Sequence, residues 1–143
     1  MSEEQNVLLV EKIYHAFVRG DLETVLGLFS EDIDWFVPGA EDIPYSGHYK
    51  TKEKVKWFFQ ILIQTTTVEK FEAREFFSKG NKVVVLGYEC IRVNATGRVF
   101  ENDWVQIWTI KEGKIVQFKE AMDTANMVKA FTSNPLKRPA LKG

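Results

Sequence analysis

The hydrophobic period of this chain changes once, near Thr65, and that change constrains the fold more than any other feature. Before it, apolar residues recur every three or four positions, which indicates amphipathic helices. After it, four β-rich runs are joined by short turns with hairpin chemistry. These runs are Val68–Phe77, Val83–Val93, Arg98–Ile110 and Ile115–Met122. Helices first and sequential hairpins afterwards predict an α+β domain with a largely antiparallel sheet.

Capping signals place the first two helices. Ser2 followed by Gln5 forms a capping box, and apolar residues at helical spacing come after it. Gly20 ends this helix, because glycine tolerates the left-handed conformation found just past many helices. Asp21 caps a second, shorter helix, expected over residues 22–29. The two helices are predicted to form a tight hairpin.

Weaker local signals predict the remaining strand, loop and helices. A short strand ends at Pro38, and residues 39–50 are expected to form a loop. Thr51 caps a third helix, and a short last helix is expected over Thr124–Phe131. A sheet that covers these helices cannot be flat, so we expect it to curl strongly around them.

Composition indicates one domain, expected over residues 1–133, with a disordered tail over 134–143. Nineteen basic and twenty acidic residues leave no electrostatic signature of a nucleic-acid-binding protein. The single cysteine, Cys90, excludes an internal disulfide and suits a reducing compartment. No run approaches the roughly 20 apolar residues of a membrane span, and the N-terminus is too acidic for a signal peptide. We therefore expect a cytoplasmic protein without membrane contact.

Six segments together resemble a known family. They are Tyr14–Glu23, Leu28–Trp35, Pro44–Tyr49, Asp103–Ile110, Gly113–Ile115 and Glu120–Ala125. In this order and spacing they are similar to the nuclear-transport-factor-2-like, SnoaL-type superfamily. The resemblance implies a conical barrel with an internal pocket between the concave sheet and the helices, and a homodimer joined through sheet surfaces. Relatives include ketosteroid isomerase, limonene epoxide hydrolase, polyketide cyclases, scytalone dehydratase and non-catalytic binding domains, so the fold does not fix the function.

Glu120 is the main candidate for a catalytic residue. On the last strand it shares one face with Val116, Phe118 and Met122, where a carboxyl is unusual because its burial without a partner is costly. Desolvation raises the pKa of such a group and makes it an acid or base near neutrality, as in the handling of carboxyls by ketosteroid isomerase. By resemblance, Glu120 also falls where the epoxide hydrolases carry a catalytic acid. The alternative is a rim carboxylate paired with a basic residue.

Three further residues are candidates for assisting roles. Asp103 is either a second pocket acid or an aspartate that faces water at a strand end. His48 is either a base or hydrogen-bond donor in the loop that, in the resemblance, borders the pocket mouth, or a histidine on the surface of that loop. Tyr88 is either a hydrogen-bond donor to a ligand or a core tyrosine.

Several positions depart from the relatives' catalytic patterns. Val37 stands at the position of the isomerase's base, and Val105 stands near its oxyanion-hole acid. Tyr88 and Cys90 correspond to the arginine and aspartate of the epoxide hydrolases. Neither known reaction is therefore expected in its known form. Two histidines without ligand spacing give no metal site, and no cofactor motif is present.

The remaining predictions concern surfaces. The pocket wall is expected to consist of Trp35, Val37, Tyr45, Trp57, Phe58, Cys90, Val105, Phe118 and Met122. Alternation then puts Trp104, Gln106 and Trp108 on the opposite face of their strand, where a row of tryptophans predicts a dimer interface.

Two functions stay open at this point. One is a cofactor-independent enzyme that isomerises, cyclises, hydrates, dehydrates or hydrolyses a small hydrophobic oxygenated molecule by acid–base chemistry. The other is a non-catalytic small-molecule-binding or protein-interaction domain of the same fold.

Overall fold

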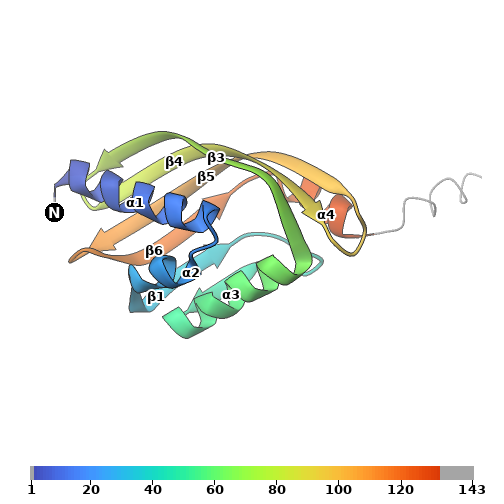
Figure 1. Ribbon diagram of the computed structural model, residues 1–143, viewed down its shortest axis with the longest axis horizontal. Helices are drawn as coiled ribbons and strands as arrows, with labels where there is room; N and C mark the ends of the chain where they lie inside the picture. The colour runs from blue at the N-terminus through green and yellow to red at the C-terminus, as the bar shows by residue number, and fades with distance from the viewer. Residues whose placement is uncertain (1, 133–143) are drawn as a thin grey trace, which may run out of the picture.

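The computed structural model describes residues 2–132 and contains four helices and six strands in that range (Figure 1). The helices are α1 (Glu3–Val18), α2 (Leu22–Gly27), α3 (Lys52–Thr65) and α4 (Thr124–Phe131). The strands are β1 (Phe29–Val37), β2 (Gly47–Lys50), β3 (Thr66–Lys79), β4 (Lys82–Val93), β5 (Val99–Lys111) and β6 (Lys114–Ala121). The predicted α+β class is confirmed. The expected tail over 134–143 lies outside the described residues.

The six strands form one curved, mixed sheet in the order β2-β1-β6-β5-β4-β3. All neighbours pair antiparallel except β1 and β6, which are parallel. The sheet is not closed, because β2 and β3 are its two edges, so the expected conical barrel is an open, curled sheet instead. Figure 1 shows it bending over the helices, with α1 against β3 and β4 and with α3 against β1 and β2.

Local signals account for the element boundaries. The Ser2–Gln5 capping box is present at the start of α1, and Gly20 follows the helix with a φ of 78°. Helix α2 ends at Gly27 rather than at residue 29, because Phe29 already belongs to β1 and pairs with Ile115. Part of the expected loop over 39–50 is also a strand, since β2 adds to the edge of β1.

The concave face of the sheet carries the hydrophobic core, and two of its tryptophans were expected elsewhere. Trp104 is 1% exposed and Trp108 is 3% exposed, and Gln106 between them is also buried. All three point toward the helices, so their predicted placement on an outer dimer face is wrong. The outer face of β5 carries Val105 and Ile107, which are half-buried.

Gly87 makes room for one of these tryptophans. A Cβ at this position would lie 2.1 Å from the Trp104 ring and 2.4 Å from the backbone oxygen of Glu72. The ring stacks on Phe71 at a centroid distance of 5.0 Å. A side chain at residue 87 would therefore displace the core between β3 and β5.

Within residues 2–132, no helix has the length and hydrophobicity needed to cross a membrane.

Candidate active site

A small cavity of about 80 Å³ lies between the concave face of the sheet and helices α1 and α3. Its wall is almost entirely apolar and is built from aromatic side chains of several elements. Trp35 of β1 stacks on Phe118 of β6 at 3.8 Å, and Trp108 of β5 meets the same phenylalanine edge-on at 4.7 Å. Phe58 of α3 packs against Trp35 from the other side. These rings surround the few polar groups that share the cavity with apolar surface, and the side chains of Glu89 and Glu120 are half-buried there.

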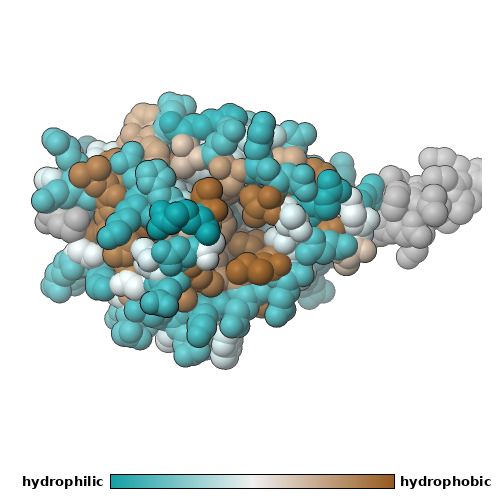
Figure 2. Space-filling model, in the orientation of Figure 1, coloured by the Kyte–Doolittle hydropathy of each residue, from teal (hydrophilic) through white to brown (hydrophobic). Residues whose placement is uncertain are grey.

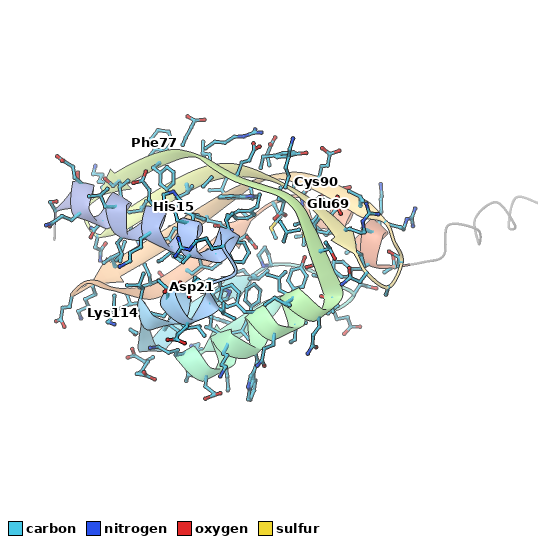
Figure 3. All side chains as sticks on the ribbon, in the orientation of Figure 1. His15, Asp21, Glu69, Phe77, Cys90 and Lys114 are labelled. Carbon is cyan, nitrogen blue, oxygen red and sulfur yellow. The ribbon has the colours of Figure 1, made fainter. Side chains whose placement is uncertain are left out.

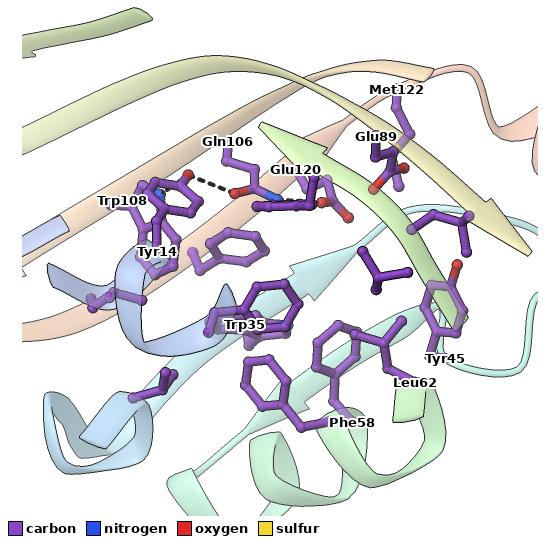
Figure 4. A pocket seen from close by; sticks show the side chains of 18 of the residues that line it. Tyr14, Trp35, Tyr45, Phe58, Leu62, Glu89, Gln106, Trp108, Glu120 and Met122 are labelled. Atoms are coloured by element: carbon purple, nitrogen blue, oxygen red, sulfur yellow. Dashed lines mark hydrogen bonds between the residues drawn. The ribbon is translucent and has the colours of Figure 1, made fainter. Parts of the chain in front are cut away.

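Two carboxyl groups, Glu89 and Glu120, line this cavity (Figure 4). Glu89 comes from β4 and Glu120 from β6, and β5 runs between these two strands. Within residues 2–132, no lysine, arginine or histidine lines the cavity. Neither carboxyl therefore has a cationic partner in the cavity wall.

The surroundings raise the pKa of both carboxyls. Burial raises the pKa of Glu89 to about 8, the charge of Glu120 adds to this rise, and the Asn102 amide opposes it. Burial also raises the pKa of Glu120 to about 7, against a hydrogen bond from Gln106 that lowers it. Like charges in a water-poor site do not ionise together readily, so the pair holds a proton into the neutral range.

A chain of hydrogen bonds leads to Glu120 from the depth of the core (Figure 4). Trp108 Nε1 donates to Tyr14 Oη over 2.9 Å. The Tyr14 hydroxyl donates to Gln106 Oε1 over 2.6 Å, and Gln106 Nε2 donates to Glu120 Oε1 over 2.7 Å. Burial raises the pKa of Tyr14 well above its ordinary value, so this hydroxyl keeps its proton.

An apolar groove adjoins the cavity between the C-terminal ends of α1 and α3 and the start of β3. Groove and cavity share five lining residues, Phe17, Phe59, Leu62, Val68 and Phe71. The groove also exposes Val18 and Ile63. Figure 2 shows a hollow bordered by hydrophobic residues on the face that carries these helices. The groove and the cavity are thus adjacent and are separated by a shared apolar wall.

Six residues predicted for the site line the cavity. They are Glu120, Trp35, Tyr45, Phe58, Phe118 and Met122. The face of β6 was therefore predicted correctly, since Phe118, Glu120 and Met122 all turn inward.

The three assisting candidates lie elsewhere. Asp103 is exposed on the outer side of β5. His48 is exposed on β2 and contacts Asp34 of β1. The Tyr88 hydroxyl donates to Glu101, and the Arg74 guanidinium lies 4.8 Å from the Tyr88 ring centre, so this tyrosine belongs to a network on the outer face. The other histidine, His15, is exposed on α1 (Figure 3).

Four of the predicted wall residues also lie outside the cavity. Val37 is buried in the core but does not reach the cavity wall. Trp57 is 50% exposed on α3, because the inner side of that helix is occupied by Phe58 and Phe59. Cys90 and Val105 are half-buried and occupy the strand positions that alternate with the inward-facing ones.

The residue that sequence reasoning missed is Glu89. On β4 it lies on the same face as Val83, Val85 and Ile91, which are all buried, so strand periodicity alone would have placed it inside. Gln106 and Tyr14 were missed for a related reason, because the buried face of β5 was assigned to an outer dimer interface.

The site offers nothing typical of a metal centre. Among residues 2–132, no group of three or more histidine, cysteine, aspartate or glutamate side chains could hold a metal ion.

Comparison with protein families decides the classification. The model of the SnoaL-like domain matches residues 10–118, which is most of the chain. The chain belongs to the SnoaL-like family. No curated protein matches this family member.

Solved structures agree with the family. A nuclear-transport-factor-2-like protein from Burkholderia xenovorans is 31% identical, with 92% of this chain and 99% of that chain covered and a TM-score of 0.84. TerC, crystallised with polyporic acid, is 23% identical over 90% of this chain and 98% of its own, with a TM-score of 0.79. A structure named as a SnoaL-like polyketide cyclase from Mesorhizobium loti is 17% identical over 85% and 99%, with a TM-score of 0.69. The last two show a common fold only.

Proposed function

We propose that this SnoaL-like protein is a cofactor-independent acid–base catalyst that shifts protons on a small hydrophobic molecule bearing oxygen. The observation that carries the proposal is the pair Glu89 and Glu120 in one apolar cavity without a cationic neighbour. General acids and bases work best when their pKa lies near the working pH. Burial raises the pKa of both carboxyls toward the neutral range.

The two carboxyls divide the work by their protonation states. Glu120 serves as the base, because the Gln106 amide donates to its carboxyl and stabilises the ionised form, while protonated Glu89 serves as the acid. Glu120 removes a proton from a carbon next to a substrate carbonyl, and Glu89 gives its proton to the carbonyl oxygen. The product is the enol, Glu120 is then neutral and Glu89 is ionised, so protons and charge balance. With a β,γ-unsaturated ketone the product is a dienol: Glu120 then returns its proton to the γ-carbon while Glu89 takes back the hydroxyl proton, which completes an isomerisation and restores both carboxyls.

The cavity wall supports a flat, apolar substrate. Ring faces of Trp35, Phe118 and Phe58 stand around the carboxyl pair, and planar molecules stack well on such surfaces. A volume of about 80 Å³ is small for a ligand site, since pockets for drug-sized molecules span roughly 300–1,000 Å³. A larger substrate therefore extends past the shared wall into the groove between α1 and α3. The crystallisation of TerC with polyporic acid gives a precedent for ligand binding in this fold.

Solvent deuterium exchange tests the proposal without knowledge of the natural substrate. The protein is incubated in heavy water with a panel of bicyclic and aryl ketones that carry α-hydrogens, and deuterium uptake is followed by mass spectrometry. We expect wild-type protein to accelerate exchange and Glu120→Gln to lose roughly 100-fold or more of that acceleration. Glu41→Gln, which changes an exposed carboxylate in the loop before β2, is the matched control and should behave as wild type.

The second candidate is a non-catalytic binding domain that uses the same cavity. The almost wholly apolar wall favours it, because such a wall binds ligands whether or not chemistry follows. Ketones that bind, shown by quenching of tryptophan fluorescence, yet exchange no faster than in buffer would establish this function and reject the catalytic one.

We also propose a homodimer, through a different surface from the one expected. On the outer face, Val84 pairs with Ile107 and Leu86 pairs with Val105, which makes a patch of four aliphatic side chains. Phe77 pairs with Val84 at its edge and is 52% exposed. Contiguous apolar patches of this kind are typical of association surfaces.

A further inference from the structure

The hydrogen-bond chain behind Glu120 has a fixed direction. An indole N–H is a donor and never an acceptor, so Trp108 must donate to Tyr14. The Tyr14 hydroxyl has one proton of its own, and the acceptor within reach is Gln106 Oε1 at 2.6 Å. The Gln106 amide is thereby oriented, and its Nε2 must face Glu120.

The opposite orientation of the amide would leave a buried donor unused. If Gln106 presented Nε2 to Tyr14, the tyrosine oxygen would accept from both neighbours and its own proton would have no acceptor. A buried unsatisfied donor is costly, whereas in the observed arrangement Trp108 Nε1, the Tyr14 hydroxyl and Gln106 Nε2 each have an acceptor. The Trp108 indole, which can only donate, thus determines through Tyr14 which end of the Gln106 amide faces the Glu120 carboxyl.

This orientation constrains Glu120 itself. Because Gln106 Nε2 donates to Glu120 Oε1, this oxygen acts as the acceptor, and the carbonyl oxygen of a neutral carboxyl is a much better acceptor than its hydroxyl oxygen. When Glu120 is neutral, its proton therefore resides on Oε2. Figure 4 shows the Glu120 carboxyl turned into the cavity at the end of this chain.

We propose that Trp108 and Tyr14 are positioning residues, which fix the Gln106 amide so that Glu120 takes up and releases its proton at Oε2 alone. Neither residue needs to touch the substrate in this role. The inference rests on the proposed function of Glu120 as a base, and it adds which of the two oxygens performs that function and what selects it.

The surroundings of Glu120 contain few other groups that could have the same effect. The titratable side chains that line the cavity with it are Tyr14 from α1, Glu89 from β4 and Tyr45 from the segment before β2. Helix α3 contributes only apolar and aromatic groups to the wall, and β5 contributes Gln106 and Trp108. Strand β1 contributes Trp35, whose buried indole N–H has no hydrogen-bond partner among residues 2–132 and therefore does not donate to Glu120. Within residues 2–132, the side chain that donates a hydrogen bond to the Glu120 carboxyl is thus Gln106.

Removing the tyrosine hydroxyl tests the role of the chain. In Tyr14→Phe the Gln106 amide is free to rotate and to present Oε1 to a protonated Glu120, which favours the neutral carboxyl. We expect the pKa of Glu120 to rise by about 1, the size of effect that one hydrogen bond to a charged group produces. The readout is the ¹³C shift of the glutamate side-chain carboxyl in labelled protein, assigned by its absence in Glu120→Gln. This titration needs no substrate, so its outcome is separate from that of the exchange assay.

Three further variants make the result decisive. Tyr49→Phe removes a tyrosine hydroxyl that donates to the Tyr45 backbone and lies outside the chain, and it should leave the Glu120 titration unchanged. Gln106→Leu removes the donor itself and should raise the pKa of Glu120 at least as far as Tyr14→Phe does. A folded Tyr14→Phe protein with a wild-type titration, beside a raised value in Gln106→Leu, would show that the amide is held without the tyrosine and would overturn the proposal. If Tyr14→Phe does not fold, Trp108→Phe replaces it, because the tyrosine then loses the donor that fixes its direction; an unchanged titration would overturn the proposal equally.

Discussion

Glu89 and Glu120 reach the same cavity from β4 and β6, on either side of β5. Each is more costly to ionise there than in water, and each makes the other more costly to ionise. This relationship has consequences for stability as well as for chemistry, and the two can be measured independently.

The first prediction concerns stability and pH. In the unfolded chain glutamate titrates at about 4.3, whereas both folded-state pKa values are raised, so the folded protein holds more protons between these values. The free energy of unfolding must then fall as pH rises through the neutral range. For the wild type we expect the free energy of unfolding in urea to fall by an amount on the order of 3 kcal/mol between about pH 6 and about pH 9. In Glu89→Gln this fall should be absent. A pH profile shared by wild type and Glu89→Gln, with Glu41→Gln as control, would contradict a buried pair.

The second prediction concerns the pH dependence of turnover. The proposed catalysis requires ionised Glu120 and protonated Glu89, so kcat/KM should be bell-shaped, with limbs near about 7 and about 8, the values to which burial raises the pKa of the two carboxyls. These limbs belong to the pair rather than to single residues. Glu89→Gln should remove the alkaline limb at a reduced rate. A limb in the range of an ordinary solvated carboxyl would mean that another group is the base.

The third prediction concerns residues that the family resemblance singled out. His48→Asn, Tyr88→Phe, Cys90→Ser and Asp103→Asn should each leave ketone exchange within about twofold of wild type, because none of these side chains lines the cavity. The same exchange assay measures all four. A folded His48→Asn protein that loses activity would show that the site extends to the β1–β2 edge.

The fourth prediction concerns Gly87. Gly87→Ala drives a methyl group into the Trp104 ring and the Glu72 carbonyl, and we expect a loss of about 3 kcal/mol or more in urea unfolding. Gly27→Ala is the matched control, since nothing lies within 4 Å of its added Cβ, and alanine in a helix should be neutral or slightly stabilising. Equal effects of the two substitutions would refute this account of the strand.

The fifth prediction concerns the homodimer. Leu86→Glu places a charge in the aliphatic patch on the outer face of β4 and β5 and should yield a monomer in light scattering coupled to gel filtration. Leu8→Glu changes an exposed leucine on α1 instead and should leave the mass unchanged. A monomeric mass for the wild-type protein at high concentration would refute the proposed homodimer.

The sequence predicted the helices well because their signals are local. The Ser2 capping box, Gly20 and the Asp21 cap each depend on neighbouring residues, and all three were confirmed. Strand β2 was missed because Gly47–Lys50 has no composition of its own that favours a strand; it is ordered by pairing with β1. Pairing between distant segments is invisible to a local pattern.

The candidate site was predicted only in part, for a reason that strand β5 illustrates. Both faces of that strand are hydrophobic, with Trp104 and Trp108 on one and Val105 and Ile107 on the other. Alternation shows that two faces exist and cannot say which of them the helices cover. The resemblance drew attention to Tyr88 and Cys90 on β4, although the buried valines on either side favour Glu89 between them.

One feature of the fold bears on how this protein could acquire new substrates. Helix α3 is the segment of chain that connects the two edge strands, β2 and β3, which do not bond to each other. Phe58, Phe59 and Leu62 on that single helix form one side of the cavity, while the carboxyls stand on strands opposite. Substitutions along about one and a half turns of α3 can therefore change the shape of the cavity without disturbing the hydrogen bonds between strands of the sheet. Under the proposed function, selectivity and reactivity reside in separable parts of the chain, which lets one change while the other is kept.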